Sequence, residues 1–285
     1  MANRMKVDTA AVRSRHPQHF GRPARDRLFV LGLGAGAMVL LVGAMVQLGF
    51  FSAKFVEGVG KLGGIAALML PPDPGAWAHV RLYLMSLVET IAISLLGTLG
   101  AAILALPVAL LAARNVVATR ALRFLTRRSL DTIRSVDILI WALIWINVVG
   151  LGPFAGVLAI MTSDIGNFGK LFSEAIEAAD RKPREGIVSC GGGAILGIRF
   201  GILPEVFPVL ASQVLYFFES NTRSATIIGI VGAGGIGLHL AEAIRTLELQ
   251  QACFIILLIL VAVAAIDVVS SQLRFALIGR RGRLA

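Results

Sequence analysis

Long apolar runs alternate with shorter polar segments, most of them basic, along the whole chain. The runs expected to be membrane helices are residues 28–51, 82–113, 136–149, 154–172, 206–218 and 252–269. A helix crosses the hydrocarbon layer with roughly 20 apolar residues, and several of these runs reach or approach that length. The pattern therefore predicts an all-α membrane protein with six transmembrane helices.

The polar segments between the runs set the expected domain organisation. The expected parts are a basic cytosolic tail (1–27), a first transmembrane helix (28–51), an extracytoplasmic loop with a short surface helix (52–81) and a core (82–285) that contains a cytoplasmic loop at 173–204. In this arrangement 22 of the 27 Lys and Arg residues lie on one side of the membrane. Because basic residues accumulate on the cytoplasmic side, we expect both termini in the cytosol.

Composition agrees with a membrane protein. Hydrophobic residues make up 56% and charged residues 15% of the chain, and the mean hydropathy is +0.81, far from the balance of a soluble domain. The basic residues behind the net charge of +10 lie mostly on one side of the predicted membrane helices, so we expect a lipid bilayer and no nucleic acid as partner. The two cysteines and four histidines are scattered, which favours neither a disulfide framework nor a metal site.

The most informative segment is residues 185–204, EGIVSCGGGAILGIRFGILP, a polar and glycine-rich interruption between apolar runs. Glu185 is followed after five residues by Gly191, and Leu203-Pro204 closes the segment where a new apolar run opens. This layout resembles the cytoplasmic coupling loop of ABC-importer permeases, whose pattern is Glu-Ala-Ala, three residues, Gly, nine residues and Ile-x-Leu-Pro. Pro204 is expected to open the fifth helix, since its missing N–H costs nothing in a first turn.

The segment departs from that pattern in two places. Gly186-Ile187 stands where two alanines are usual, and Gly201 occupies the Ile position. A literal Glu177-Ala178-Ala179 lies upstream, but Pro183 rather than Gly follows six residues after Glu177. The resemblance therefore implies that residues 185–196 form the coupling helix. The residues to which it gives an ATPase-coupling role are Glu185, Gly186, Ile187, Gly191, Leu203 and Pro204.

A second glycine-rich stretch, residues 225–241, contains G-x-G-x-x-G at 232–237. In a soluble α/β protein this motif indicates a dinucleotide site, but that fold needs alternating strands and helices and an acidic residue about 20 positions later. Here the flanking segments are membrane helices, so an enzyme that binds a nucleotide is not favoured. So many glycines make a poor isolated helix. We expect a partly re-entrant segment that lines a cavity, because irregular backbone at membrane depth needs protein or water around it.

Further motifs narrow the resemblance to phosphonate-importer permeases. They are Pro71-Pro72-Asp73, Glu89-Thr90-Ile91, Ala112-Ala113-Arg114-Asn115, residues 150–156 (GLGPFAG), and residues 221–226 (NTRSAT) followed by the Gly-rich stretch. The resemblance implies a type I permease that forms a homodimer, binds two cytoplasmic ATPase subunits and receives substrate from an extracytoplasmic binding protein. It also implies that the chain is not itself an enzyme and holds no cofactor, because ATP and Mg belong to the partner ATPase, and that it resides in the bacterial inner membrane.

Candidate residues of the substrate pathway follow from the same resemblance and from intramembrane polarity. They are Glu89, Asn221, Arg223, Ser224, Thr226, Gly232, Gly234, Gly235 and Gly237. A carboxylate inside a membrane run, such as Glu89, is a functional candidate by default. Counted at about 1.5 Å per residue from Pro204, Arg223 is expected near the outer mouth, where it could meet an anion. An equally weighted alternative pairs Arg223 with Glu219 one helical turn earlier.

Other transport functions stay open from the sequence. Methionine-importer permeases share the Gly-rich stretch, and phosphate or phosphite would suit the same oxyanion chemistry. A stand-alone secondary transporter would need ion-coupling carboxylates at the membrane midplane and usually an internal repeat, and no duplication is apparent. A membrane-embedded enzyme would need an ionisable cluster at one depth with an access path, which the sequence does not indicate.

Overall fold

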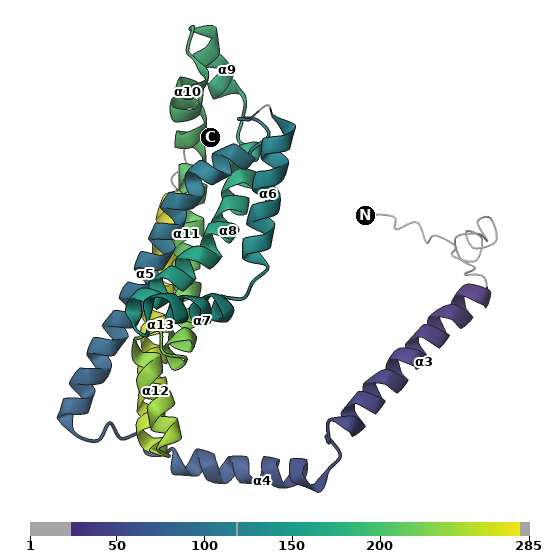
Figure 1. Ribbon diagram of the computed structural model, residues 1–285, viewed down its shortest axis with the longest axis vertical. Helices are drawn as coiled ribbons and strands as arrows, with labels where there is room; N and C mark the ends of the chain where they lie inside the picture. The colour runs from purple at the N-terminus through teal and green to yellow at the C-terminus, as the bar shows by residue number, and fades with distance from the viewer. Residues whose placement is uncertain (1–23, 118, 280–285) are drawn as a thin grey trace, which may run out of the picture. The chain divides into compact units, whose positions relative to one another are not determined.

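The computed structural model describes residues 24–117 and 119–279 (Figure 1). Within these residues all regular secondary structure is helical, which confirms the all-α prediction. The chain divides into two compact units, residues 1–67 and 68–285. Each unit is described by itself.

The first unit contains two helices, α3 (Ala24–Gln47) and α4 (Ala53–Leu68), joined by a turn. Helix α3 includes a 20-residue stretch that is long and apolar enough to cross a membrane, and it ends four residues earlier than the predicted span at 28–51. Helix α4 carries an i, i+4 ion pair between Glu57 and Lys61 at 2.7 Å. The predicted extracytoplasmic loop thus contains a regular helix of 16 residues. Of the predicted basic tail at 1–27, residues 24–27 belong to α3, and residues 1–23 lie outside the described residues.

The second unit is a bundle built around α8. Its long helices are α5 (Trp77–Ala112), α8 (Pro153–Ala178), α11 (Leu203–Ile230) and α13 (Leu249–Gly279), and its shorter ones are α6 (Arg120–Arg134), α7 (Ile138–Val149) and α12 (Ile236–Arg245). Helix α8 packs against α5, α6, α7 and α11, while α13 packs against α11 and α12. The segment between α8 and α11 projects at one end of this bundle and α12 lies at the other (Figure 1).

Small residues allow α5 and α8 to approach closely. Ala101, Ala105 and Ala109 recur every four residues on one face of α5 and are completely buried. One turn earlier, a Cβ added to Gly97 would lie 2.7 Å from Ile160 of α8. Lipid tails are as apolar as the helices, so helix association in a membrane depends on close packing of this kind.

Length and composition single out four helices in the described residues that could cross a membrane. The qualifying stretches are Leu28–Gln47, Trp77–Ala112, Ala194–Ile230 and Leu249–Leu277. Helices α6 and α7 would form a fifth span if counted together, although they are bent by 87° at their junction. Helix α8, the fourth of the six expected spans, is 26 residues long but too polar to qualify. Its polar residues have partners inside the bundle, as described below.

The Gly-rich stretch differs from its prediction in two respects. Helix α11 continues to Ile230, so residues 225–230 are regular helix instead of irregular backbone. A turn at 231–235 follows, and Gly232, at φ 105°, ends α11 by donating its N–H to the carbonyl of Gly229. The N–H of Ala233 bonds to the Ile228 carbonyl at 3.3 Å, which completes the double hydrogen bond typical of a helix C-terminus with glycine. Residues 233–235 of the turn are buried, and Gly234 and Gly235 pack against Glu89, Thr90 and Pro153.

Gly237 should tolerate no side chain. A Cβ there would lie 2.0 Å from the carbonyl oxygen of Thr226, because the start of α12 packs directly on the last turns of α11. We expect Gly237→Ala to lower the free energy of unfolding by about 1–3 kcal/mol, the usual cost of overpacking. Thermal unfolding in detergent measures this. Gly186→Ala is the matched control, since a Cβ at Gly186 meets nothing within 4 Å; equal unfolding temperatures of the two variants would contradict the prediction.

Candidate coupling surface and translocation site

The predicted coupling loop is a compact helical projection at the end of the bundle (Figure 1). It consists of α9 (Lys182–Ser189), α10 (Ala194–Leu196) and a π-helical segment (Gly197–Ile202). Two residues after the end of α9, Gly191 has φ 84° and donates its N–H to the Val188 carbonyl at 2.9 Å. A left-handed residue at this position is most often glycine. The backbone of the turn therefore favours glycine at position 191.

The coupling residues are mostly accessible. Glu185, Gly186 and Gly191 are exposed, and Ile187 is half-buried. Large apolar side chains are exposed on the same projection, namely Val188, Ile195, Leu196 and Phe200. Exposed apolar patches of this kind mark surfaces that contact another protein.

Helix α11 begins at Leu203 with Pro204 in its first turn, as predicted. A π-helical segment directly precedes Leu203, so residues 194–230 form one helical stretch of 37 residues. Gly201, which departs from the family pattern, has a local reason: a Cβ there would lie 3.0 Å from the Cα of Arg184 in α9.

A groove of about 490 Å³ lies between α9 and the adjoining ends of the bundle helices. Its polar lining includes Asn115, Arg181, Arg184, Glu185 and Ser189. Arg184 crosses from α9 and donates to the backbone carbonyl of Asn115. The groove separates part of α9 from the bundle, and the hydrogen bond from Arg184 to the Asn115 carbonyl connects the two.

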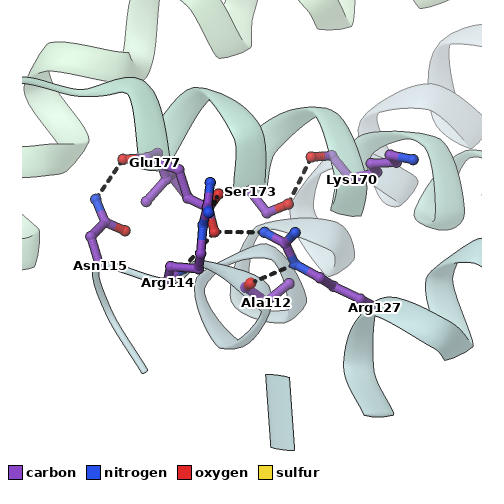
Figure 2. Close-up of polar contacts among 8 residues, drawn as sticks. Ala112, Arg114, Asn115, Arg127, Lys170, Ser173 and Glu177 are labelled. Atoms are coloured by element: carbon purple, nitrogen blue, oxygen red, sulfur yellow. Dashed lines mark hydrogen bonds and ion pairs between the residues drawn. The ribbon is translucent and has the colours of Figure 1, made fainter. Parts of the chain in front are cut away.

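Glu177, set aside as a coupling residue by its spacing, lies at the centre of a charged junction where α5, α6 and α8 meet (Figure 2). Its carboxylate accepts the backbone N–H of Arg114 at 2.6 Å, Arg114 Nε at 2.9 Å and the Arg127 guanidinium at 2.6 Å. Arg127 Nε also donates to the Ala112 carbonyl, in the last residue of α5, at 3.1 Å. The junction therefore connects the C-terminal ends of α5 and α8 with the middle of α6, beside the coupling projection.

The electrostatics of the junction favour an ionised Glu177. This residue lies beyond the predicted span at 154–172. Burial raises the pKa of Glu177, but the hydrogen bonds from Arg114 and the charges of Arg127 and Arg114 outweigh that effect and lower it from the usual 4.5. The carboxylate is charged at neutral pH, and its contribution to stability is lost only as the pH falls through this lowered pKa.

The Gly-rich turn meets Glu89 and Thr90 of α5. Glu89 Oε1 accepts the N–H of Gly235 at 3.2 Å, and Thr90 Oγ1 accepts the N–H of Ile236 at 2.8 Å. These N–H groups lie at the start of α12, where a negative charge is favourable. Glu89 thus occupies the place that a substrate anion could take, and Gly234 packs against its side chain.

Asn221 belongs to a polar cluster in the centre of the bundle. Its amide donates to Thr98 Oγ1 of α5 at 2.8 Å and to the carboxylate of Asp164 in α8. Asn167 donates to the other oxygen of Asp164 at 3.2 Å. Asp164 is 3% exposed and Asn221 5% exposed, so this cluster holds α5, α8 and α11 together away from solvent.

Arg223 points to a different face of α11. It pairs with Glu219 at 3.3 Å, as the alternative interpretation predicts, and its own side chain is 53% exposed. Glu219 also pairs with Arg274 of α13 at 3.2 Å, and Ser270 one turn earlier donates to the Leu215 carbonyl. This part of α11 lies alongside the second half of α13, towards the C-terminus. The position of Arg223 at the outer mouth stays a prediction, and the structure adds that α11 extends seven residues past Arg223, to Ile230.

The remaining pathway candidates bond within their own helix. Ser224 donates to the Ser220 carbonyl at 3.4 Å, and Thr226, which is buried, to the Thr222 carbonyl at 3.2 Å. The structure therefore brings Glu89 to Gly234 and Gly235 of the turn, Asn221 to Thr98 of α5, and Thr226 to Gly237 at the start of α12. Arg223 and Ser224 take no part in these contacts.

Sequence reasoning missed part of the contact between α5 and α11. The hydroxyls of Thr90, Ser94 and Thr98 are buried at four-residue spacing on α5, and Ser94 Oγ lies 3.2 Å from Thr222 Oγ1 of α11. This spacing was visible in the sequence as a polar stripe in an otherwise apolar helix. Asp164 was also visible, but its partners on α5 and α11 were not.

Comparison with known proteins agrees with this architecture. Residues 105–282 match the family described as binding-protein-dependent transport system inner membrane component. The chain belongs to this family. It is 34% identical over 254 residues to a putative phosphite transport system permease protein, HtxC, of Stutzerimonas stutzeri, with 89% of this chain and 88% of that protein covered.

Two further comparisons place the family match in context. The phosphate-import permease protein PhnE of Mycolicibacterium smegmatis is 37% identical over 90% of this chain, which spans only 48% of that protein. Among solved structures, an inward-facing MetNI methionine ABC transporter chain superimposes with a TM-score of 0.63 at 18% identity, covering 71% of this chain and 99% of that one. The last similarity establishes the fold, an ABC-importer permease fold of type I.

Replacing Asn221 should destabilise the bundle. Asn221→Leu keeps the approximate volume but removes the amide that bonds Asp164 and Thr98, and each buried polar group left without a partner costs about 1–3 kcal/mol. We expect a clear fall in the unfolding temperature in detergent. Ser224→Ala, which loses only a 3.4 Å bond to its own helix, is the control. If both variants unfold at the parental temperature, the buried cluster does not stabilise the bundle.

Proposed function

We propose that this chain is the membrane permease subunit of an ATP-driven importer for phosphonate-like oxyanions. The observation that carries the proposal is the match along nearly the full length of both chains to a permease named for phosphite transport. The relative named for phosphate import points to the same oxyanion chemistry. Motifs at residues 71–73, 112–115 and 221–237 favour phosphonates within this group.

The proposed partners are a second copy of the chain, two cytoplasmic ATPase subunits that hold ATP and Mg, and an extracytoplasmic binding protein. The exposed projection with Glu185, Gly186 and Ile187 supports docking of an ATPase, since it combines charge with exposed apolar side chains. Gly191 lets the chain turn back at the tip, and Leu203-Pro204 continues into α11. A movement of the ATPases would then tilt α11 and alternate access to the pathway.

The proposed pathway follows the seam between α5 and α11. Glu89 and the turn of Gly232, Gly234, Gly235 and Gly237 close one part of it, and Asn221 and Thr226 line the part that is packed shut in this structure. Arg223, half-exposed beside Ser224, offers the guanidinium that could guide an oxyanion. Its pairing with Glu219 would keep that attraction weak enough for release.

The orientation predicted by the basic residues, with both termini cytosolic, can be tested with two cysteines. Cys190 is exposed on the coupling projection, and Glu248 is exposed at the opposite end of the bundle. In a Cys253→Ser background, Cys190 should react with a membrane-impermeant maleimide only in inverted vesicles. With Cys190 also replaced by serine, Glu248→Cys should react only in intact cells. Reaction of both positions from the same side would contradict the orientation.

Reconstitution tests the function. The chain is incorporated into liposomes with the ATPase and binding protein of its own transport system, and ATP-dependent uptake of methylphosphonate is measured with phosphate and phosphite as competitors. Uptake of methylphosphonate in preference to both supports the proposal; preference for either competitor corrects the substrate within the same class. Uptake that needs no ATPase would indicate a secondary transporter and contradict the proposal.

Substitutions of Arg223 test the proposed pathway in the same uptake assay. We expect Arg223→Ala to lower uptake roughly tenfold, the effect of losing one charge-assisted hydrogen bond, and Arg223→Lys to recover part of it because the charge remains. Arg245→Ala, at an exposed arginine at the end of α12, is the matched control. Parental uptake by Arg223→Ala, or failure of that complex to assemble, would leave Arg223 with only the structural role of pairing Glu219.

A further inference from the structure

The coupling projection is attached to the bundle through very few polar contacts. Arg184 of α9 donates to the carbonyl of Asn115, and the side-chain amide of Asn115 donates to the Ile176 carbonyl of α8 at 2.7 Å. The groove beside α9 separates the two over part of their length. Besides its covalent connections to α8 and α11, α9 therefore contacts the bundle at Asn115, which lies next to Arg114; Glu177 and its neighbour Ile176 bind these two residues (Figure 2).

Glu177 connects that attachment point to three helices. Its side chain is 11% exposed and accepts three hydrogen bonds, two from Arg114 and one from Arg127. Arg127 belongs to α6, and its second contact is the last carbonyl of α5, where a cation is favourable. Removing the Glu177 charge would leave Arg114 and Arg127 close together without their shared partner.

The junction differs from the packing that holds the bundle together. Along α5 and α8, contact is made by small apolar residues at close range, which resists any relative movement. Glu177, at the end of α8, and Arg127, in the middle of α6, are instead charged groups, and the Arg127 side chain is 38% exposed. Charge-assisted bonds of this kind hold groups at a defined geometry and are about twice as strong as neutral ones.

We propose that Glu177 is a positioning residue that transmits movement of the coupling helix α9 to α5 and α6, through Arg184, Asn115, Arg114 and Arg127. This inference rests on the proposed importer function. A contiguous set of contacts does not by itself demonstrate coupling, so the test must separate transmission from stability.

The experiment uses the complete complex in liposomes, with the ATPases, the binding protein and methylphosphonate as the probe. The measured quantity is the ratio of methylphosphonate-stimulated to basal ATP hydrolysis, per assembled complex. Glu177→Gln keeps the shape of the side chain and removes its charge. We expect this ratio to fall about three- to thirtyfold, the range of mutations that weaken coupling between sites, while basal hydrolysis is unchanged.

Matched controls are available on the same helices. Glu174→Gln changes an exposed carboxylate one turn earlier on α8, and Arg128→Gln changes the neighbour of Arg127 on α6, which pairs with Asp131. Both should keep the parental ratio. Arg127→Gln should lower the ratio, and the double variant with Glu177→Gln should be no worse than the more affected single variant, because both act on one bond.

Each outcome decides the matter. A parental ratio in assembled Glu177→Gln complexes overturns the inference, and so do additive losses in the double variant. If Glu177→Gln does not assemble, Arg127→Gln decides, and a parental ratio there overturns the inference. Absence of stimulation in the parental complex contradicts the proposed substrate or function instead, so the two failures are distinguishable.

Discussion

The close approach of α5 and α8 is the constraint on which the rest of the bundle depends. Alanines at 101, 105 and 109, with Gly97 one turn before, leave room for neither a large side chain nor water between the two helices. A polar group on this seam must therefore find a protein partner. Asp164 accepts hydrogen bonds from Asn221 and Asn167, and Thr98 accepts one from Asn221. The packing of α5 on α8 therefore also determines where α11 lies.

Much of this arrangement could be predicted from hydrophobic runs, because α3, α5 and α13 are apolar over lengths that only a membrane requires. The start of α11 beside Pro204 could also be predicted, but the π-helical segment before it and the helix end at Ile230 could not, because no local sequence signal marks them. Likewise, residues 225–230 include Gly229 and yet are helical, because α12 packs on them. A Cβ added to Gly229 or to Gly237 would lie 3.0 Å from the Cα of the other glycine.

In the candidate site, too, sequence patterns located the residues, whereas their contacts with other helices could not be predicted. The coupling loop was located by the spacing of Glu185, Gly191 and Leu203-Pro204, and the structure places it on an exposed projection. Glu89 and the Gly-rich turn were each identified from the sequence. Nothing in the sequence indicated that the carboxylate of Glu89 accepts the N–H of Gly235, 146 positions away. The pairing of Arg223 with Glu219 could be predicted from the four-residue spacing, but the second partner of Glu219, Arg274 of α13, could not.

The polar groups of this bundle fall into two kinds, and their surroundings explain why. Asp164, Asn221 and Thr98 are buried in the centre, where an unpaired group costs most and a stable, fully bonded cluster is favoured. Glu177, Arg114 and Arg127 lie beside the segment that carries α9, and Arg114 and Arg127 are partly exposed to solvent. Under the proposed importer function, opening the seam between α5 and α11 would break the hydrogen bond between Asn221 and Thr98, so the central cluster would stabilise the closed arrangement seen here. The junction at Glu177 would then determine whether α5 and α6 move together with α9.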